Sequence, residues 1–551
     1  MTTTTTTRSN GQWALGDREP LNGNETLKQE DDGLNVRARI EQVYAKQGFA
    51  SIDPSDLRGR MRWWGLYTQR RQGIDGGRTA SIAPEELDDE YFMLRVRVDG
   101  GTLTTAQLRV VAQLSTQFGR DTADITDRQN IQLHWIRIED VPQIWQRLEA
   151  VGLTTAEACG DVPRVILGSP VAGVSADEVI DATPAIEAIR DRFIANPELS
   201  NLPRKFKTAI SWLPDTAPEI NDVSFIGVIH PTLGPGFDLL VGGGLSTNPK
   251  FAVRLGAFVT LEEIPEVWYG VVRIFRDYGY RRLRHRARLK FLVTDWGASK
   301  FRDVLQTEYL GYALPDGPAA ELPAQTLDHV GVHRQRDGRE YVGFAPIAGR
   351  VSGTVLTSIA DAAEDAGSGR VRLTAHQKFV VLDVEPARTE QLIETIAAVG
   401  LYARPSVWRR SVMACTGLEF CKLAIVETKV KAQTLVEELE RRLDDLALSQ
   451  PIAIHLNGCP NSCARIQTAD IGLKGQIVTN DAGEQVAGFQ VHLGGGLGLD
   501  AGFGRKLRSL KVTSDDLGEY VERLARRFDE QRLPDERFAQ WAVRAEESSL
   551  R

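Results

Sequence analysis

The stretch ITDRQNIQLHWI (residues 125–136) returns in altered form as LTAHQKFVVLDV (373–384), and this repeat decides the fold. Val-Gly-Leu follows each copy, at 151–153 and at 399–401, so the spacing holds without a gap. In each copy, apolar residues at helical spacing precede the strand-like stretch. Each copy therefore predicts a unit of strand, helix, strand and helix.

A second pair of repeats alternates with the first. GFDLLVGGGL (236–245) is echoed by GFQVHLGGGL (488–497). The order A, B, A′, B′ indicates a gene duplication and predicts a pseudo-twofold α+β molecule. Chance similarity is the alternative, and two pairs in matching order count against it. A cleft between two such halves is a common place for a cofactor.

Length and composition set further bounds. A chain of 551 residues is too long for one core, so two to four domains are expected. The net charge of -8 argues against a nucleic-acid binder. No apolar run is long enough to span a membrane, and MTTTTTTRSNGQWALG (1–16) lacks a signal-peptide core. We expect a disordered lead at the N-terminus and a cytoplasmic location.

Four of the five cysteines lie between 415 and 463, in ACTGLEFCKLA (414–424) and NGCPNSCAR (457–465). So few cysteines, in an odd number, argue against a disulfide framework. Structural zinc sites use pairs two to four residues apart, so the wider Cys415–Cys421 spacing counts mildly against zinc. Four thiolates are also the ligand set of an iron-sulfur cluster. Zinc and inert or redox thiols remain open alternatives.

Basic side chains share strand faces in three segments. YFMLRVRVDGG (91–101) places Arg95 and Arg97 opposite its apolar residues, and RKFKTAIS (204–211) places two lysines opposite Phe206. In TDRQNIQLHW (126–135) the expected polar face carries Arg128, Asn130, Gln132 and His134, opposite Ile131, Leu133 and Trp135. These faces are either solvated or convergent on an anion.

The cysteine pairs, NGCPNSCAR and the duplication together resemble the sirohaem and 4Fe-4S sulfite and nitrite reductases, and especially the ferredoxin-dependent sulfite reductases of actinobacteria. The resemblance runs from GQWALG (11–16) to RFAQWAVRAEE (537–547). It implies a ferredoxin-like half-domain and a sirohaem-binding α+β domain, each present twice. The expected divisions are an N-terminal wrap (1–80), the first half-domain (81–160), the first sirohaem-binding domain (161–325), the second half-domain (326–403) and the second α+β domain, which carries the cluster (404–551).

The resemblance also implies roles for individual residues. Cys415, Cys421, Cys459 and Cys463 would hold the 4Fe-4S cluster, and Cys463 would also be axial to the sirohaem iron. The substrate-binding and proton-donating quartet would be Arg95, Arg164, Lys205 and Lys207. Macrocycle contacts would come from Arg128, Gln132 and Asn461.

Three further residues stand out in this comparison. Asp124 takes a position where some relatives carry an arginine, so other basic residues are needed there. His134 is expected to be a packed strand histidine rather than an iron ligand. Tyr67 and Cys159 match a pair that is joined by a thioether bond in actinobacterial relatives.

The implied activity is the six-electron reduction of sulfite to sulfide by an assimilatory enzyme. The Lys205-x-Lys207 pattern favours sulfite over the alternative, ferredoxin-dependent reduction of nitrite to ammonia. A non-catalytic four-cysteine metal-binding protein is the alternative from another class. No flavin or nicotinamide motif is recognisable, so ferredoxin is the expected electron donor to a monomer. Candidate docking residues are Arg409, Arg410 and the stretch 281–290, and the alternative for either group is a solvated or carboxylate-binding role.

Overall fold

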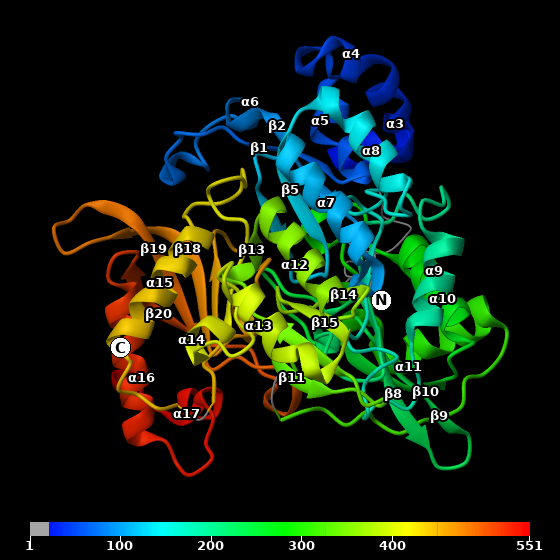
Figure 1. Ribbon diagram of the computed structural model, residues 1–551. Coiled ribbons are helices and arrows are strands. Elements are labelled where there is room, and N and C mark those ends of the chain that lie inside the picture. Colours follow the sequence, from blue (N-terminus) through cyan, green and yellow to red (C-terminus); the bar gives the residue numbers. More distant parts are fainter. Residues whose placement is uncertain (1–20, 325–326, 449) are drawn as a thin grey trace, which may run out of the picture.

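A computed structural model describes residues 21–324, 327–448 and 450–551 (Figure 1). The threonine run, GQWALG and residues 325–326, at the expected division between the first and second halves, lie outside these ranges. The first described segment forms four short helices before the first strand. They are α2 (Gly23–Glu30), α3 (Val36–Arg39), α4 (Ala45–Gln47) and α5 (Pro54–Arg58).

The A repeats form two five-stranded antiparallel sheets. The first has the order β1-β2-β5-β4-β13, and the second has the order β11-β12-β15-β14-β3. The strands of the first sheet are β1 (Leu66–Arg70), β2 (Asp88–Val96), β5 (Ile131–Ile136), β4 (Ala123–Ile125) and β13 (Arg350–Val351). Those of the second are β11 (Gly331–Arg334), β12 (Glu340–Phe344), β15 (Phe379–Val384), β14 (Arg370–Leu373) and β3 (Thr102–Thr104).

The two A repeats exchange edge strands. Strand β13 of the second repeat pairs with β4 of the first, with Arg350 opposite Asp124. Strand β3 of the first repeat pairs with β14 of the second, with Leu103 opposite Val371. One continuous core runs through both sheets, so the two half-domains fold as an interlocked body.

Helices cover the half-domain sheets and pack on each other where they meet. They are α7 (Thr105–Phe118), α8 (Val141–Glu149), α12 (Gly353–Asp365) and α13 (Thr389–Ala397), and the short α6 (Pro84–Leu87) leads into β2. A Cβ at Gly353 would collide with the Ala112 carbonyl of α7, so glycine permits the close approach of α12 to α7.

The B repeats form two mixed sheets of the same topology. In each sheet the first three strands are parallel and the last three antiparallel. The first contains β6 (Pro163–Leu167), β7 (Phe206–Ser211), β8 (Val223–His230), β9 (Gly234–Val241) and β10 (Val253–Val259). The second contains β16 (Val412–Ala414), β17 (Ile454–Asn457), β18 (Ile471–Thr479), β19 (Gln485–Leu493) and β20 (Arg505–Thr513).

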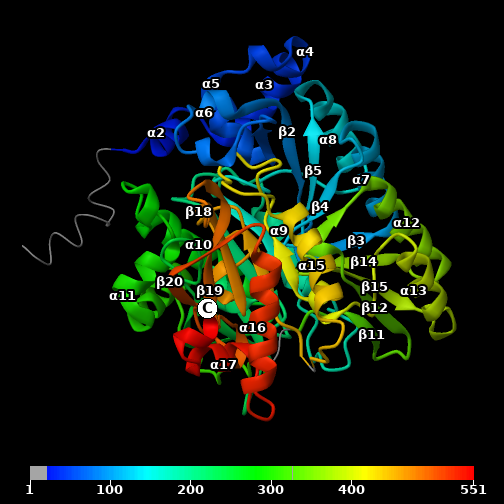
Figure 2. The same ribbon diagram turned by 90° about the vertical axis from the view of Figure 1, so that its left-hand side faces the viewer.

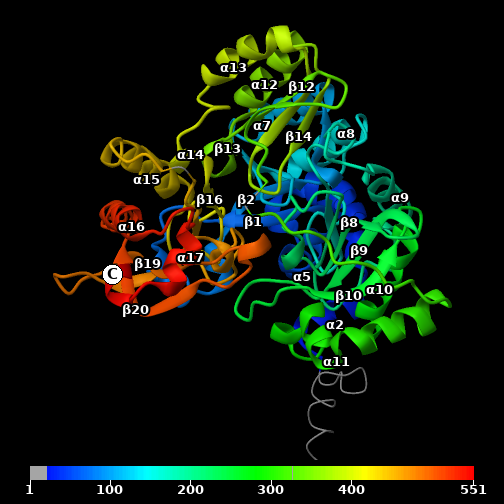
Figure 3. The ribbon, with the colours of Figure 1, turned by 90° about the horizontal axis from the view of Figure 1, so that it is seen from below.

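Each B sheet packs its apolar face on its own helices. The first core contains α9 (Thr183–Phe193), α10 (Ile264–Tyr278) and α11 (Leu289–Val304), and the second contains α15 (Lys429–Arg442), α16 (Leu517–Gln531) and α17 (Phe538–Arg544). The short α14 (Val407–Arg410) leads into β16. Figure 2 shows α16 in front of β18 to β20, and Figure 3 shows the two B sheets on opposite sides of the molecule. The prediction of a duplicated α+β architecture is confirmed.

The predicted alternation holds in β7 and fails in β5. Phe206 is fully buried in the first B core, and Lys205 and Lys207 flank it. In β5, Trp135 has a φ of +61°, and the pairing with β2 shifts register beside it. This bulge turns Trp135 away from the side of Leu133, so the prediction that the two share a face is wrong.

Candidate active site

Two adjacent parallel strands bring the cysteine loops together. Strand β16 runs beside β17, with Ala414 opposite Leu456. Cys415 and Cys459 follow the carboxyl ends of these strands, and neighbouring parallel strands end at one edge of a sheet. The Gly458 amide donates to Cys415 Sγ at 3.2 Å, so the two loops touch.

A tight turn returns Cys421 to the same edge. Gly417 has a φ of +73°, and a Cβ there would collide with the Thr428 hydroxyl, so glycine is required. Thr428 Oγ1 donates to the Cys415 carbonyl at 2.7 Å. The Cys421 amide donates to the Gly417 carbonyl at 3.0 Å, which closes the turn.

Cys463 projects from the second loop. It is exposed, whereas Ser462 and Ala464 on either side are buried. The Ala464 amide donates to Asn457 Oδ1 at 2.8 Å, and Ser462 has a φ of +57°. This kinked backbone holds the Cys463 thiol clear of the core. Asn461 is exposed on the same loop, and its backbone amide donates to the sulfur of Cys459.

The four thiols of the second half lie within electrostatic reach of one another. Burial, and after it the neighbouring Cys463, raise the pKa of Cys415 to about 12. Burial and then Cys463 likewise raise the pKa of Cys459, and burial raises that of Cys421. Such thiols become good ligands when a cation stabilises the thiolate.

The spacing of these thiols suits a cluster better than a single ion. Within the described ranges, no three His, Cys, Asp or Glu side chains are grouped closely enough to hold one metal ion. A tetrahedral zinc site places every sulfur about 2.3 Å from one centre. A cluster of several irons takes the same four thiolates at wider spacing, so the donor set fits an iron-sulfur cluster.

The predicted cationic side chains lie around a space next to the Cys463 thiol. Arg95 of β2 lies opposite Gln132 of β5 and donates to its Oε1 at 2.6 Å. Arg164, at the start of β6, donates from Nε to the Gly160 carbonyl at 3.0 Å. Burial lowers the pKa of Arg95, whereas the nearby sulfurs of Cys159 and Cys463 raise it. The sulfur of Cys463 and the guanidinium of Arg95 therefore face the same space.

Lys205 and Lys207 border the same space, beside Arg164 and Arg128. Burial lowers the pKa of Lys205 to about 7, with Arg288 and Arg164 adding to the effect. Burial, Arg128 and Lys205 lower the pKa of Lys207 well below its usual value. An ammonium with a lowered pKa gives up its proton readily, so both lysines are suited to proton transfer.

Several buried donors around this space lack partners. Among the described residues, the Nε atoms of Arg95, Arg128 and Arg465 are buried without a hydrogen-bond partner. Arg128 donates from Nη1 to Asn221 at 2.8 Å and from Nη2 to the Val165 carbonyl at 2.9 Å. Unsatisfied buried cations are costly, and the carboxylates of an acidic macrocycle would satisfy them. The residues present therefore fit sirohaem.

Tyr67 and Cys159 are neighbours at the edge of this space. Cys159 is fully buried and accepts a hydrogen bond from Arg95 Nη1 at 3.3 Å. Burial raises the pKa of Tyr67 and the nearby Cys159 raises it further, whereas Arg164 lowers it. The two residues named in the predicted cross-link are thus close enough to interact.

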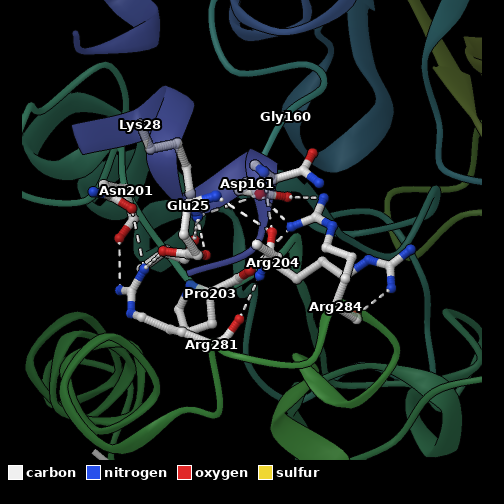
Figure 4. A network of polar contacts seen from close by, with 12 residues as sticks. Glu25, Lys28, Gly160, Asp161, Asn201, Pro203, Arg204, Arg281 and Arg284 are labelled. Carbon is white, nitrogen blue, oxygen red and sulfur yellow. Dashed lines mark hydrogen bonds and ion pairs between the residues drawn. The ribbon is translucent and has the colours of Figure 1, made fainter. Parts of the chain in front are cut away.

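An ion-pair network fixes the loop that carries Cys159 (Figure 4). Asp161 accepts from Arg284 Nη2 at 2.9 Å and lies 3.4 Å from Lys28 Nζ of α2. Lys28 also pairs with Glu25 at 2.7 Å, and Glu25 pairs with Arg281 at 3.0 Å. The N-terminal helix is therefore locked against the active-site wall.

Asp124 is paired with three neighbouring side chains. It pairs with Arg350 at 2.8 Å, with Lys429 at 3.2 Å and with His134 at 3.0 Å. His134 is fully buried and stacks on Phe420 with 3.9 Å between ring centroids. The prediction of a packed strand histidine is confirmed.

The candidate docking residues are engaged internally. Arg410 pairs with Asp328 at 2.7 Å and Arg409 with Glu440 at 3.0 Å. Within 281–290, Arg281 and Arg284 belong to the network of Figure 4. Arg288 is buried against Asp222 at 2.9 Å, and Lys290 is buried as well. The prediction of this stretch as a docking face is wrong for these four residues, because their charges are neutralised or enclosed by the fold.

Sequence reasoning missed three members of the cationic site. Arg204, Arg288 and Arg465 all lie close enough to change the pKa of a lysine or arginine in the site. Arg465 ends the motif NGCPNSCAR, so its place in the sequence offered a signal. Arg288 had none, because its position depends on the buried Asp222.

Fold and site define a class of protein: a duplicated α+β redox enzyme in which one half presents four thiols and the other a buried cationic pocket. The sequence matches the family model described as nitrite and sulphite reductase 4Fe-4S domain at 159–314 and 408–551. It matches the nitrite/sulfite reductase ferredoxin-like half domain at 85–151 and 333–399. The chain belongs to the nitrite and sulfite reductase family.

Individual relatives agree with this assignment. The chain is 62% identical to "Sulfite reductase [ferredoxin]" of Mycobacterium tuberculosis, over 99% of this chain and 98% of the relative. It is 36% identical to "Ferredoxin--nitrite reductase" of Leptolyngbya laminosa, over 92% and 96%. The solved structure of the Mycobacterium tuberculosis NirA protein superposes with a TM-score of 0.96 at 62% identity, covering 98% of this chain and 100% of that one.

Proposed function

We propose that this protein is a ferredoxin-dependent sulfite reductase that converts sulfite to sulfide in six one-electron steps. The observation that carries the proposal is the convergence of Arg95, Arg164, Lys205 and Lys207 on the space in front of Cys463. Relatives over 60% identical are named sulfite reductases, and those near 36% are named nitrite reductases, so the comparisons favour sulfite. They also favour an enzyme over a non-catalytic four-cysteine protein.

Cofactor binding divides between the halves. The second half holds the 4Fe-4S cluster on Cys415, Cys421, Cys459 and Cys463. Cys463 would also hold the sirohaem iron. Arg128, Gln132 and Asn461 would hold the macrocycle, and the unpaired Nε of Arg128 would be available to one of its carboxylates. When bound, sirohaem supplies the iron at which sulfite receives electrons that arrive through the cluster.

Binding and proton transfer come from the first half. The guanidinium groups of Arg95 and Arg164 donate to the sulfite oxygens and offset their charge. Each oxygen leaves as water after it has been protonated. Lys205, whose pKa is about 7, and Lys207 supply these protons from a partly buried pocket.

A thioether bond between Tyr67 and Cys159 would hold the Arg95 side of the pocket. Its formation joins the Cys159 sulfur to a ring carbon of Tyr67 and releases two protons and two electrons, which molecular oxygen accepts. Peptide mass mapping tests the bond. A cross-linked peptide is expected, and a Cys159 that is free and alkylatable in the active enzyme would contradict it.

The domain division and the cellular setting are also part of the proposal. The divisions at about 80, 160, 325 and 403 separate the N-terminal wrap, the first half-domain, the first sirohaem-binding domain, the second half-domain and the cluster domain. In the part of the chain that the structure describes, no helix is long and apolar enough to cross a membrane. We infer a cytoplasmic monomer of sulfur assimilation that receives electrons from ferredoxin.

The test is spectroscopic and kinetic. The purified protein is expected to show sirohaem and cluster absorption and to reduce sulfite with a higher kcat/KM than nitrite. A colourless zinc protein would support the non-catalytic alternative. A strong preference for nitrite would support the nitrite reductase.

A further inference from the structure

A cavity of about 320 Å³ lies in the second half and borders the site described above, since Arg465 belongs to both. Its walls come from the turn between β14 and β15, from the amino ends of β16 and β17, and from the Gly495–Gly496 turn and the C-terminal helices. The turn contributes His376 and Lys378, and the strand ends contribute Arg410 and Ala453. Nothing in the proposed reaction uses these side chains.

Strand register places this cavity at the pseudo-twofold position of the substrate pocket. The Lys207 amide donates to Asp222 Oδ2 at 2.8 Å, and the Ala453 amide donates to Asp470 Oδ2 at 2.8 Å. Gly242 and Gly494 donate to the carbonyls of the same two aspartates, at 2.8 and 2.9 Å. Ala453 is therefore the counterpart of Lys207.

The same register identifies two more counterparts. Arg164 lies two residues before Ile166, which pairs in β7 with Thr208, the residue beside Val223 of β8. Arg410 lies two residues before Val412, which pairs in the same way with Ile454 of β17. The A repeats match His376 to Arg128. The second cavity thus keeps two cationic or imidazole positions and lacks the lysine pair.

Its inner wall carries hydrogen-bond donors that the protein does not use. Lys378 is 3% exposed, and among the described residues its ammonium donates to one acceptor, the His376 carbonyl at 3.1 Å. Arg465 also lines the cavity, and its Nε lies 3.5 Å from Asp127 Oδ2. Burial lowers the pKa of Lys378 to about 8, so the group remains largely charged at neutral pH.

Three acidic residues on the walls, Asp328, Asp500 and Glu536, are paired with arginines. Asp328 binds Arg410 through two hydrogen bonds, at 2.7 and 2.9 Å, and Asp500 pairs with Arg537. Burial raises the pKa of Asp470 to about 7, which reduces its negative charge. Among the described residues Lys378 forms no ion pair, so the charge left uncompensated at the inner wall is that of its ammonium. A buried cation with unused donors favours an anion.

We propose that this cavity binds a small anion through a carboxylate or phosphate group that contacts Lys378 and His376. The volume is at the lower end for small-molecule sites, which suits a compact ligand. Duplication explains its origin, since it is the second copy of an anion pocket. The loss of the lysine pair at this position makes it a binding site without reductive chemistry.

Titration calorimetry of the purified holoenzyme tests the proposal, with inorganic phosphate, sulfate and succinate as separate probes. At least one probe is expected to bind at a class of site that Lys378→Met weakens at least tenfold. Lys207→Met is the matched control, because it removes the equivalent charge from the substrate pocket and should leave this class of site intact. Phosphate binding without succinate binding would identify a phosphate site, and the reverse a carboxylate site.

Two results would overturn the proposal: no binding of any probe to the wild type outside the substrate pocket, or the same isotherm for Lys378→Met and the wild type. The visible spectrum and melting temperature show whether Lys378→Met is folded. Ala453→Leu provides a second test, since it narrows the cavity mouth without touching the buried charge. It is expected to weaken the same class of site, and unchanged binding would contradict the assignment.

Discussion

Strands β6 and β7 of the first half and strands β16 and β17 of the second are the same pair of parallel strands, used at opposite ends. In the first half, Arg164 and Lys207 stand at the amino ends of the pair. In the second half, Cys415 and Cys459 follow the carboxyl ends. Each half thus carries functional side chains at one end of its strand pair. The pseudo-twofold arrangement places the cysteines of the second half opposite the cations of the first.

The largest expected effect comes from the loss of one cluster ligand. Cys415→Ser removes one of the four thiolates, so the cluster absorption should disappear and sulfite turnover should fall at least about 1,000-fold, because electrons no longer reach the iron. Cys159→Ser is the matched control, since this thiol belongs to the first half and should leave the cluster spectrum intact. A Cys415→Ser protein with a full cluster spectrum would contradict the ligand assignment.

The next largest effect comes from the loss of a proton donor in the cationic pocket. Lys207→Met should lower kcat for sulfite by about 100-fold to 1,000-fold with a smaller change in KM, because the side chain acts as a proton donor. The exposed Lys250→Met serves as a control of equal chemistry. A rise in KM with kcat unchanged would assign Lys207 to binding alone.

The pH profile sharpens the role of the other lysine. Lys205 donates a proton only in its charged form, and its pKa is lowered to about 7. Turnover should therefore be highest below this pH and fall about tenfold for each unit above it. Lys205→Arg keeps the charge at every pH, so it should lower the rate and remove this limb of the profile. A limb that persists in the variant would point to another donor.

Arg164→Lys tests anion binding with the charge conserved. Arginine offers a rigid fork of donors that lysine cannot reproduce. The loss of a charge-assisted hydrogen bond costs about 1.5–3 kcal/mol, so KM for sulfite should rise about 10-fold to 100-fold. An unchanged KM would remove Arg164 from the substrate contacts.

The smallest effect concerns stability. Lys28→Met removes one cation from the network of Figure 4, while Arg281 and Arg284 still compensate Glu25 and Asp161. The expected loss is about 1–3 kcal/mol, less than for a buried pair left without any partner, and the melting temperature should fall by a few degrees. Lys46→Met, at an exposed site, should leave it unchanged. Equal melting of the two variants would contradict the role of the network.

The sequence predicted the features that local patterns encode. The repeats predicted the duplicated architecture, and the alternation around Phe206 placed Lys205 and Lys207 on the face opposite the core. It did not predict the exchange of β3 and β13 between half-domains, because edge pairing depends on two segments far apart in the chain. The bulge at Trp135 was also missed, since a positive φ at a tryptophan carries no sequence signal.

The prediction of a docking surface at 281–290 rested on charge alone, and it is wrong for Arg281, Arg284 and Arg288. The stretch 281–290 has the composition of an exposed basic patch, yet Arg281, Arg284 and Arg288 lie against Glu25, Asp161 and Asp222. Those acidic partners come from distant parts of the chain. Only the folded arrangement shows that the charges are neutralised inside the protein.

The comparison of kcat/KM for sulfite and nitrite, measured on the purified holoenzyme with reduced ferredoxin, tests the central claim most directly. A pocket with two buried lysines beside two arginines should reduce sulfite with the higher kcat/KM. A strong preference for nitrite, or no turnover of either anion by protein that carries both cofactors, would contradict it.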